Sequence, residues 1–241
     1  MELVFEEIDY QETDLGAISL RKRSEPRLEN RLIYEVKLNE EWLMSSLFVD
    51  AEEELSRLGL QKLNANGHTD NLNVVVGGLG LGYTSVTALN NPDVSSLRTI
   101  DVMPAVIDWH KRGLLPVGDV LDTDLRSELI LGDFFAIASS PDDGFITSDK
   151  VHAVLLDIDH SPSHWLNQGN QGFYTQESLS NMANKIQKNG VFGLWSNDLP
   201  DQIFIDLLDR VFATTETHII EFANPYSGHT STNSVYICTV S

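Results

Sequence analysis

A β-branched run passes directly into four glycines in the sequence Val74-Val75-Val76-Gly77-Gly78-Leu79-Gly80-Leu81-Gly82. Such a run indicates a buried strand, and the glycines let the chain turn sharply while a ligand touches the backbone. A dinucleotide fingerprint would require a third glycine or alanine where this chain has Tyr83. The Gly-x-Gly-x-Gly spacing instead matches loops that bind S-adenosylmethionine, with a tight turn that holds no ligand as the alternative.

Strands and helices alternate on the C-terminal side of this loop. The sequence predicts strands at 73–76, 97–101, 128–132, 151–158, 191–195, 217–222 and 234–240, the last two as a closing hairpin. It predicts helices at 82–89, 175–188 and 201–212, and Pro104 marks the first turn of another. The alternation is typical of an α/β protein with a doubly wound, mainly parallel, seven-stranded sheet, the Rossmann-like methyltransferase fold.

The N-terminal part of the chain has a different pattern. Residues 1–48 carry short alternating runs broken by polar turns, which predict a small antiparallel β-domain. We assign the ligand-binding domain to residues 49–241. Asp50 and Glu53 predict a capping box at the helix that opens this second domain.

Composition limits the partners and the compartment. The chain has 36 acidic and 16 basic residues, so its formal net charge is -20. That charge disfavours nucleic acid and membrane partners and tolerates a cationic substrate, although an acidic surface also serves solubility. Cys238 is the single cysteine, which excludes an internal disulfide. With no leader pattern from Met1 to Glu7 and no apolar stretch of about 18 residues, we expect a cytoplasmic protein.

Carboxylates stand at the ends of the next two predicted strands. Asp101 is placed to hydrogen-bond the ribose hydroxyls of a nucleoside, and Asp133 to accept from the adenine amino group. Either residue could instead cap the helix or turn that follows it. The predicted cofactor site comprises Gly77, Gly78, Gly80, Gly82, Asp101, Val102 and Asp133.

The candidate reaction centre follows the predicted strand 151–158. Asp157 and Asp159 share one face of an extended chain, and either can act as a general base toward an attacking amine. His160, Trp165 and Tyr174 are candidate substrate contacts. A metal at His160 and His164 is not expected, because Pro162 lies between them and no further ligand cluster accompanies them.

These motifs resemble those of the spermidine synthase superfamily, the polyamine aminopropyltransferases, and more closely its uncharacterised bacterial spermidine-synthase-like branch. The matching segments cover most of the chain in the family order and are 44–48, 76–84, 100–109, 155–162 and 190–196. The resemblance implies a methyltransferase-like fold with an N-terminal β-domain, and a homodimer or higher oligomer. It also implies that Gly78 and Gly80 line the cofactor, that Asp101 and Asp133 hold its ribose and adenine, and that Asp157 is the catalytic aspartate.

The chain departs from the family on the amine side of the site. Its Asp157–Pro162 segment is one residue longer than the family pattern, and residues 38–46 lack the expected glutamine. The Tyr-His-Glu of the following helix is replaced by Glu52-Glu53-Glu54. Three hypotheses follow for a small-molecule acceptor: aminopropyl transfer from decarboxylated S-adenosylmethionine to an amine, methyl transfer from S-adenosylmethionine, or a catalytically idle nucleoside-binding protein.

Overall fold

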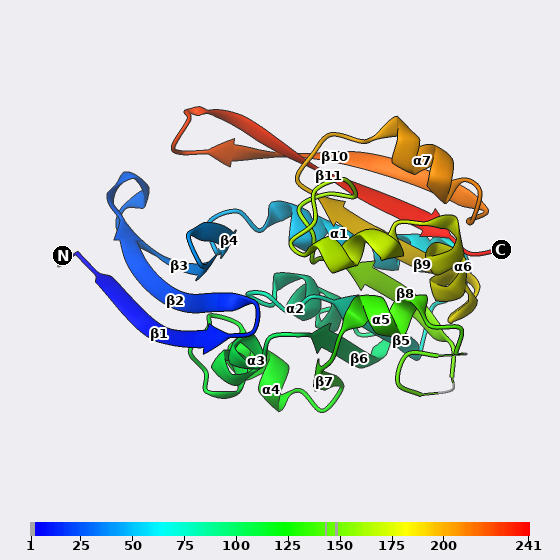
Figure 1. Cartoon of the computed structure of the whole chain (residues 1–241), viewed down its shortest axis with the longest axis horizontal. Helices are drawn as coiled ribbons and strands as arrows, with labels where there is room; N and C mark the ends of the chain where they lie inside the picture. The colour runs from blue at the N-terminus through cyan, green and yellow to red at the C-terminus, as the bar shows by residue number, and fades with distance from the viewer. Residues whose placement is uncertain (1–2, 143, 148) are drawn as a thin grey trace.

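The strand before the glycine loop lies inside a seven-stranded sheet of order β10-β11-β9-β8-β5-β6-β7. The computed structural model describes residues 3–142, 144–147 and 149–241. The strands of this sheet are β5 (Leu72–Gly77), β6 (Val94–Asp101), β7 (Ser127–Leu131), β8 (Val151–Leu156), β9 (Ile186–Ser196), β10 (Thr214–Asn224) and β11 (His229–Thr239). β5 to β9 pair in parallel, whereas β11 is antiparallel to both β9 and β10. The predicted fold class is confirmed (Figure 1).

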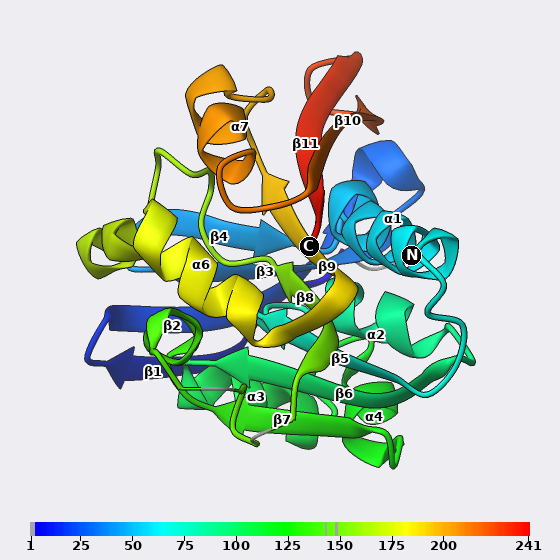
Figure 2. The ribbon, with the colours of Figure 1, turned by 90° about the vertical axis from the view of Figure 1, so that its right-hand side faces the viewer.

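Helices cover both faces of the sheet because the side chains of a strand alternate between them. Val74 and Val76 pack into one buried cluster, and Val75 packs into the other. The first cluster lies under α1 (Asp50–Ala65), α2 (Tyr83–Leu89), α3 (Pro104–Lys111) and α4 (Gly118–Thr123). The second lies under α5 (Phe134–Ser139), α6 (Gln176–Asn184) and α7 (Gln202–Leu208), and it contains Cys238, as expected for a core residue. Figure 2 shows α1 and α6 on opposite sides of the large sheet.

A second, four-stranded sheet forms the N-terminal part of the molecule. Its antiparallel strands are β1 (Phe5–Thr13), β2 (Gly16–Glu25), β3 (Arg31–Leu38) and β4 (Glu41–Ser45), with a 3-10 turn at Pro26–Leu28. Ile18, Leu20 and Val36 of this sheet join the buried cluster of the large sheet, so the two sheets share a core. The small antiparallel sheet is confirmed, and the first two residues of the predicted 1–48 segment lie outside the described residues.

Two local predictions were wrong. Asp50 does not cap α1: Val49 occupies the cap position without a side-chain hydrogen bond, and Asp50 is already helical. The helix predicted to reach Lys188 ends at Asn184, because Ile186 is buried and pairs with Val151 as the start of β9. Asn189 and Gly190 therefore do not stop a helix; they lie in β9 where its pairing with β8 steps from Ile186 to Val191.

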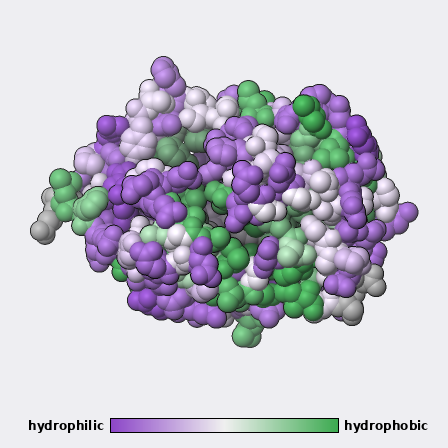
Figure 3. All heavy atoms as spheres, in the orientation of Figure 1, coloured by the Kyte–Doolittle hydropathy of each residue, from purple (hydrophilic) through white to green (hydrophobic). Residues whose placement is uncertain are grey.

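Hydrophilic side chains cover most of the face shown in Figure 3, and apolar side chains gather toward its middle. Within the described residues, no helix combines the length and the apolar character needed to cross a bilayer.

Candidate functional site

The glycine loop approaches the chain after β8 so closely that a side chain would not fit. Gly78, Gly80 and Gly82 have φ of +94°, +48° and +91°, a region that L side chains rarely adopt. A Cβ on Gly78 would lie 2.1 Å from the carbonyl oxygen of Asp157. From beneath, the buried His110 places Nε2 2.9 Å from the carbonyl oxygen of Gly80. Gly78 and Gly80 thus present bare backbone to the space above the loop.

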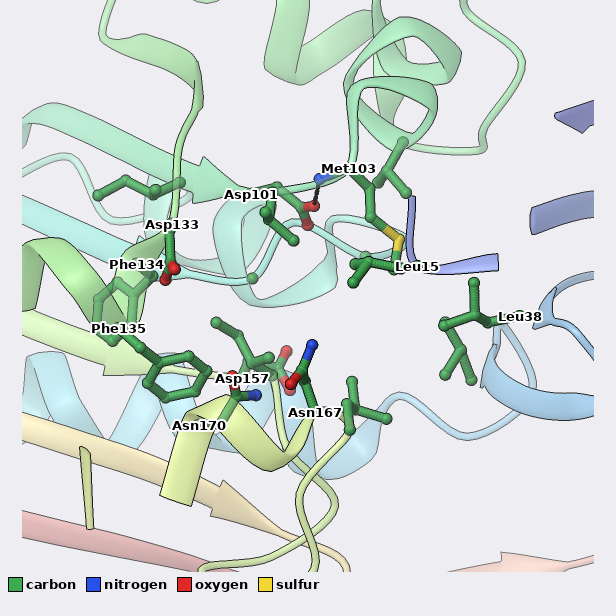
Figure 4. A pocket seen from close by; sticks show the side chains of 18 of the residues that line it. Leu15, Leu38, Asp101, Met103, Asp133, Phe134, Phe135, Asp157, Asn167 and Asn170 are labelled. Atoms are coloured by element: carbon green, nitrogen blue, oxygen red, sulfur yellow. Dashed lines mark hydrogen bonds between the residues drawn. The ribbon is translucent and has the colours of Figure 1, made fainter. Parts of the chain in front are cut away.

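That space is a cavity of about 230 Å³ at the carboxyl ends of β5, β6 and β8, closed on the far side by the N-terminal sheet. Figure 4 shows Asp101 and Asp133 on one side of it and Asp157, Asn167 and Asn170 on the other. Its remaining lining is mainly apolar and comprises Leu15, Leu38, Leu43, Met44, Gly78, Gly80, Ile100, Val102, Met103, Val106, Phe134, Phe135, Ile158 and Leu166.

Asp101 links the glycine loop to α3. One carboxylate oxygen accepts from the Leu79 amide at 2.8 Å, and the other accepts from the Met103 amide at 2.8 Å. Burial raises the pKa of Asp101, and these backbone donors, together with the Gly80 amide, oppose the rise. Each oxygen keeps acceptor capacity toward the cavity, so bracing the loop and binding a ligand hydroxyl are compatible.

The other predicted cofactor residues do not all reach the cavity. Val102 and Asp133 line it, and Asp133 also caps α5 by accepting from the Ala136 amide at 3.0 Å. The Asp133 carboxylate can therefore cap α5 and face the cavity at the same time. Gly77 packs against Phe134 and does not line the cavity, while Gly82 lines a smaller chamber behind the loop.

Asp157 belongs to both the cavity and this chamber, where a second acid accompanies it. One of its oxygens accepts from the Thr84 hydroxyl at 2.6 Å. Burial raises the pKa of Asp157 to about 6. Burial, and then the charge of Asp157, raise the pKa of Glu52 well above its usual value. The chamber of about 80 Å³ thus contains two interacting carboxyl groups whose pKa values are both raised.

The structure separates Asp159 from Asp157. Asp159 is 3% exposed and accepts from the Leu166 amide, the Asn170 side chain and the Tyr174 hydroxyl at 2.9, 2.7 and 2.9 Å. It holds the loop after β8 together and lines neither the cavity nor the chamber, although the sequence placed both acids on one face. The reason is that β8 ends at Leu156, so its alternation does not extend to Asp159.

Among the predicted substrate contacts, only His160 lines the chamber. Burial, followed by the neighbouring His164 ring 5.1 Å away, lowers the pKa of His160. Tyr174 donates to Asp159, and the Trp165 indole donates to the Pro162 carbonyl at 2.8 Å, so both stabilise the loop. Among the residues that the structure describes, no group of three or more His, Cys, Asp and Glu is placed to hold a metal ion.

Sequence reasoning missed three residues of the site. Glu52 and Thr84 lie on α1 and α2, far from Asp157 in the chain, and His110 lies on α3 under the loop. The sequence did contain a signal for Glu52. It lies on the first turn of α1, within the Glu52-Glu53-Glu54 segment that replaces the Tyr-His-Glu implied by the family resemblance. Nothing in the sequence marked Thr84 or His110, whose roles depend on helix packing.

We expect Asp101→Ala to weaken the binding of methylthioadenosine by about 1.5–3 kcal/mol, the range for hydrogen bonds to charged groups. The substitution removes the carboxylate that we expect to accept from the ribose, and it also removes the acceptor of the Leu79 amide. Titration calorimetry measures the affinity, and Asp108→Ala, on α3 in a surface ion pair with Arg112, is the control. Unchanged affinity in Asp101→Ala would remove Asp101 from the binding site.

Comparison with known proteins gives both sequence and structural relatives. No family model matches the chain. The polyamine aminopropyltransferase of Sulfolobus acidocaldarius is 28% identical over 149 residues, which span 60% of this chain and 44% of that protein. Less than half of this curated relative is therefore matched.

Three solved structures share the fold. The spermidine synthase of Thermotoga maritima has a TM-score of 0.71 at 16% identity, and the alignment covers 98% of this chain and 73% of that one. A spermidine synthase in complex with the transition state analogue AdoDATO gives 0.69 at 16% identity, over 98% and 72%. Human methyltransferase-like protein 13 in complex with SAH gives 0.60 at 15% identity, over 79% and 82%.

The structural likenesses extend over nearly all of the chain for the two spermidine synthases, including the N-terminal sheet that precedes the methyltransferase-like part. In sequence, the chain is thus similar to a polyamine aminopropyltransferase, and it shares a methyltransferase-like fold with the two spermidine synthases and the human methyltransferase-like protein.

Proposed function

We propose that this protein transfers an aminopropyl group from decarboxylated S-adenosylmethionine to an amine. One observation carries the choice of donor. Within the described residues, neither Lys nor Arg lines the cavity or the chamber, whereas Asp101, Asp133, Asp157 and Glu52 do. A ligand carboxylate would meet acids and apolar side chains there, while a cationic aminopropyl chain would be stabilised.

The residues present fit such a donor. Bare backbone at Gly78 and Gly80, with the carboxylates of Asp101 and Asp133, forms a cradle for a ribose and an adenine amino group. Phe134 and Phe135 supply apolar surface beside Asp133. When bound, the donor supplies a sulfonium whose propyl carbon is open to attack.

The acids of the chamber would handle the amine and its proton. The amine lone pair forms a bond to the propyl carbon, the carbon–sulfur bond breaks, and its electron pair stays on sulfur. The proton of the attacking nitrogen passes to the Asp157 carboxylate, as expected of a general base. Glu52 would hold the amine beside Asp157. We assign the base to Asp157 rather than Asp159, because the three hydrogen bonds of Asp159 hold its carboxylate in the loop.

Product analysis tests this proposal. The protein is incubated with decarboxylated S-adenosylmethionine or with S-adenosylmethionine and a panel of amines. We expect release of methylthioadenosine with the decarboxylated donor. Release of adenosylhomocysteine from S-adenosylmethionine would instead favour methyl transfer. In that case the loop amides would hold the methionine carboxylate. The fold is also shared with a human methyltransferase-like protein, which is consistent with this alternative. Binding without either product would favour a catalytically idle nucleoside-binding protein. That hypothesis rests on the differences from the expected family pattern at residues 52–54.

The ionisation of Asp157 predicts a pH profile. A base must be ionised to accept a proton, so the rate of transfer should rise as pH increases through about 6, the pKa of Asp157. Thr84→Val removes the donor that stabilises the carboxylate, so the acid limb should move to higher pH by about one unit. Kinetics from pH 5 to 9 measure this shift, with Thr87→Val on the same helix as the control. If the acid limb of the pH–rate profile does not move in Thr84→Val, Asp157 is not the group whose ionisation sets the pH dependence.

The division of the chain at residue 48, the homodimer and the cytoplasmic location stay predictions. Limited proteolysis tests the domain division, and sedimentation tests the homodimer.

A further inference from the structure

Beyond the chamber lies a wider groove of about 770 Å³ between the N-terminal sheet and the β10–β11 hairpin. It shares six lining residues with the chamber: Leu43, Met44, Ser45, Glu52, His160 and Trp195. Arg23 of β2 donates to the Tyr226 hydroxyl at 2.5 Å, which joins the hairpin to the N-terminal sheet beside the groove. An acceptor whose nitrogen reached Asp157 would therefore extend its body into this groove.

The charges of the groove are almost fully balanced. Of its two lining glutamates, Glu35 is 6% exposed and accepts from Arg21 at 2.8 Å and from Arg23 at 2.9 Å. Arg23 also pairs with Glu25 at 2.7 Å, so two arginines face two glutamates. Within the described residues, this leaves Glu52, at the chamber end, as the one lining carboxyl group without an ion pair.

Within the described residues, the outer groove therefore has no unpaired acid for a second ammonium group, since Glu35 is paired with Arg21 and Arg23. Glu41 and Asp198 raise the pKa of His160 by their charge, but neither lines the groove. The net charge of -20 attracts cations in general, yet this long-range attraction is screened beyond about 10 Å and does not replace a local partner. A remote ammonium that entered the groove would lose hydration without gaining an ion pair.

The groove instead offers neutral hydrogen-bonding groups and aromatic rings. The Thr230 and Thr232 hydroxyls and the Asn197 side-chain nitrogen make no hydrogen bond to other residues that the structure describes. Phe48 and Phe222 lie beside them with their ring centroids 5.5 Å apart. Such a surface matches a body that carries hydroxyl or amide groups, since these both donate and accept.

We infer that the acceptor carries one cationic amine, which reaches Asp157 and Glu52, on a neutral body that bears hydroxyl or amide groups and occupies this groove. The inference rests on the proposed function and narrows its acceptor to a class distinct from free diamines. Asn197→Asp adds the missing carboxylate with little change of shape, because Oδ1 of Asn197 already accepts from Asn233 at 3.2 Å.

A matched pair of acceptors tests it. Putrescine and N-acetylputrescine have the same chain, but the acetylated compound replaces the remote ammonium by a neutral amide. We expect kcat/KM to be about tenfold higher for N-acetylputrescine than for putrescine. The amide can pair with the neutral hydrogen-bonding groups of the groove, which the ammonium of putrescine would leave without a matching partner. Calorimetric titration of each amine onto the protein saturated with methylthioadenosine should give the same order of affinity without turnover.

Asn197→Asp should shift the ratio toward putrescine by about fivefold, the value of a partly exposed ion pair. Gln176→Glu, which adds the same charge at the exposed start of α6, should leave the ratio unchanged. Equal or better use of putrescine by the unmodified protein would overturn the inference and leave aminopropyl transfer standing. Methylthioadenosine binding with no release from any amine would overturn the inference and the proposed function together.

Discussion

Asp157→Asn is expected to reduce turnover by roughly 10²–10⁴, the usual contribution of a general base. The amide cannot take the proton of the attacking amine, whereas its carbonyl oxygen can still accept from the Thr84 hydroxyl, so the local geometry is kept. Methylthioadenosine should therefore bind with nearly the same affinity. Single-turnover kinetics and calorimetry together separate the two effects.

The same substitution should stabilise the fold at neutral pH. The pKa of Asp157 in the folded protein, about 6, exceeds its value of about 3.9 in an unfolded chain. The folded state therefore loses stability as pH rises between these values and carries the whole penalty above pH 6. At pH 8 we expect Asp157→Asn to raise the free energy of unfolding by on the order of 1 kcal/mol, an advantage that should vanish near pH 4. Asp122→Asn, an exposed acid on α4, is the control.

A loss of activity accompanied by lower stability at pH 8 would contradict the account of Asp157 as a buried acid whose pKa is raised by burial. Unchanged turnover would remove Asp157 from the mechanism.

Gly78→Ala should abolish nucleoside binding and destabilise the fold. The added Cβ would lie 2.1 Å from the Asp157 carbonyl oxygen, at a φ of +94° that alanine adopts only with strain. Relieving the overlap would push the glycine loop away from the residues after β8. This movement would distort both the cavity and the chamber, because the loop lines each of them. Strain and overpacking together are expected to lower the free energy of unfolding by about 2–4 kcal/mol.

Thermal unfolding and calorimetry measure these losses. Gly172→Ala is the matched control, because a Cβ there would meet no atom within 4 Å. Equal melting temperatures and equal affinities in the two variants would show that the loop tolerates a side chain and that the cradle of bare backbone is not required.

The sequence predicted the order of the main elements because their side chains repeat with clear periods. The run Val74 to Val76 alternates between the two buried clusters, and the glycines after it mark a turn at positive φ that L side chains rarely adopt. Helix ends were less predictable. Asn189-Gly190 looks like a helix stop, but the burial of Ile186 in β9 overrides that local signal.

That Gly80, Asp101 and Asp133 line one cavity, the part of the site that we assign to the nucleoside, could be predicted because they lie at strand ends that a parallel sheet brings together. The amine side could not, since it depends on packing between distant elements. Thr84 reaches Asp157 across 73 residues of sequence, and Glu52 reaches the chamber from α1. Asp159 shows the converse: its position beside the strand suggested catalysis, and only its three hydrogen bonds reveal a structural role.

The most direct measurement is a calorimetric titration of the protein with decarboxylated S-adenosylmethionine, S-adenosylmethionine and methylthioadenosine. The cavity is lined by three acids and the adjoining chamber by one more, Glu52, and neither is lined by Lys or Arg among the described residues. The protein should therefore bind the decarboxylated compound at least about tenfold more tightly than the parent. No heat of binding and no rise in melting temperature with any of the three would contradict the assignment of this cavity to an adenosyl sulfonium.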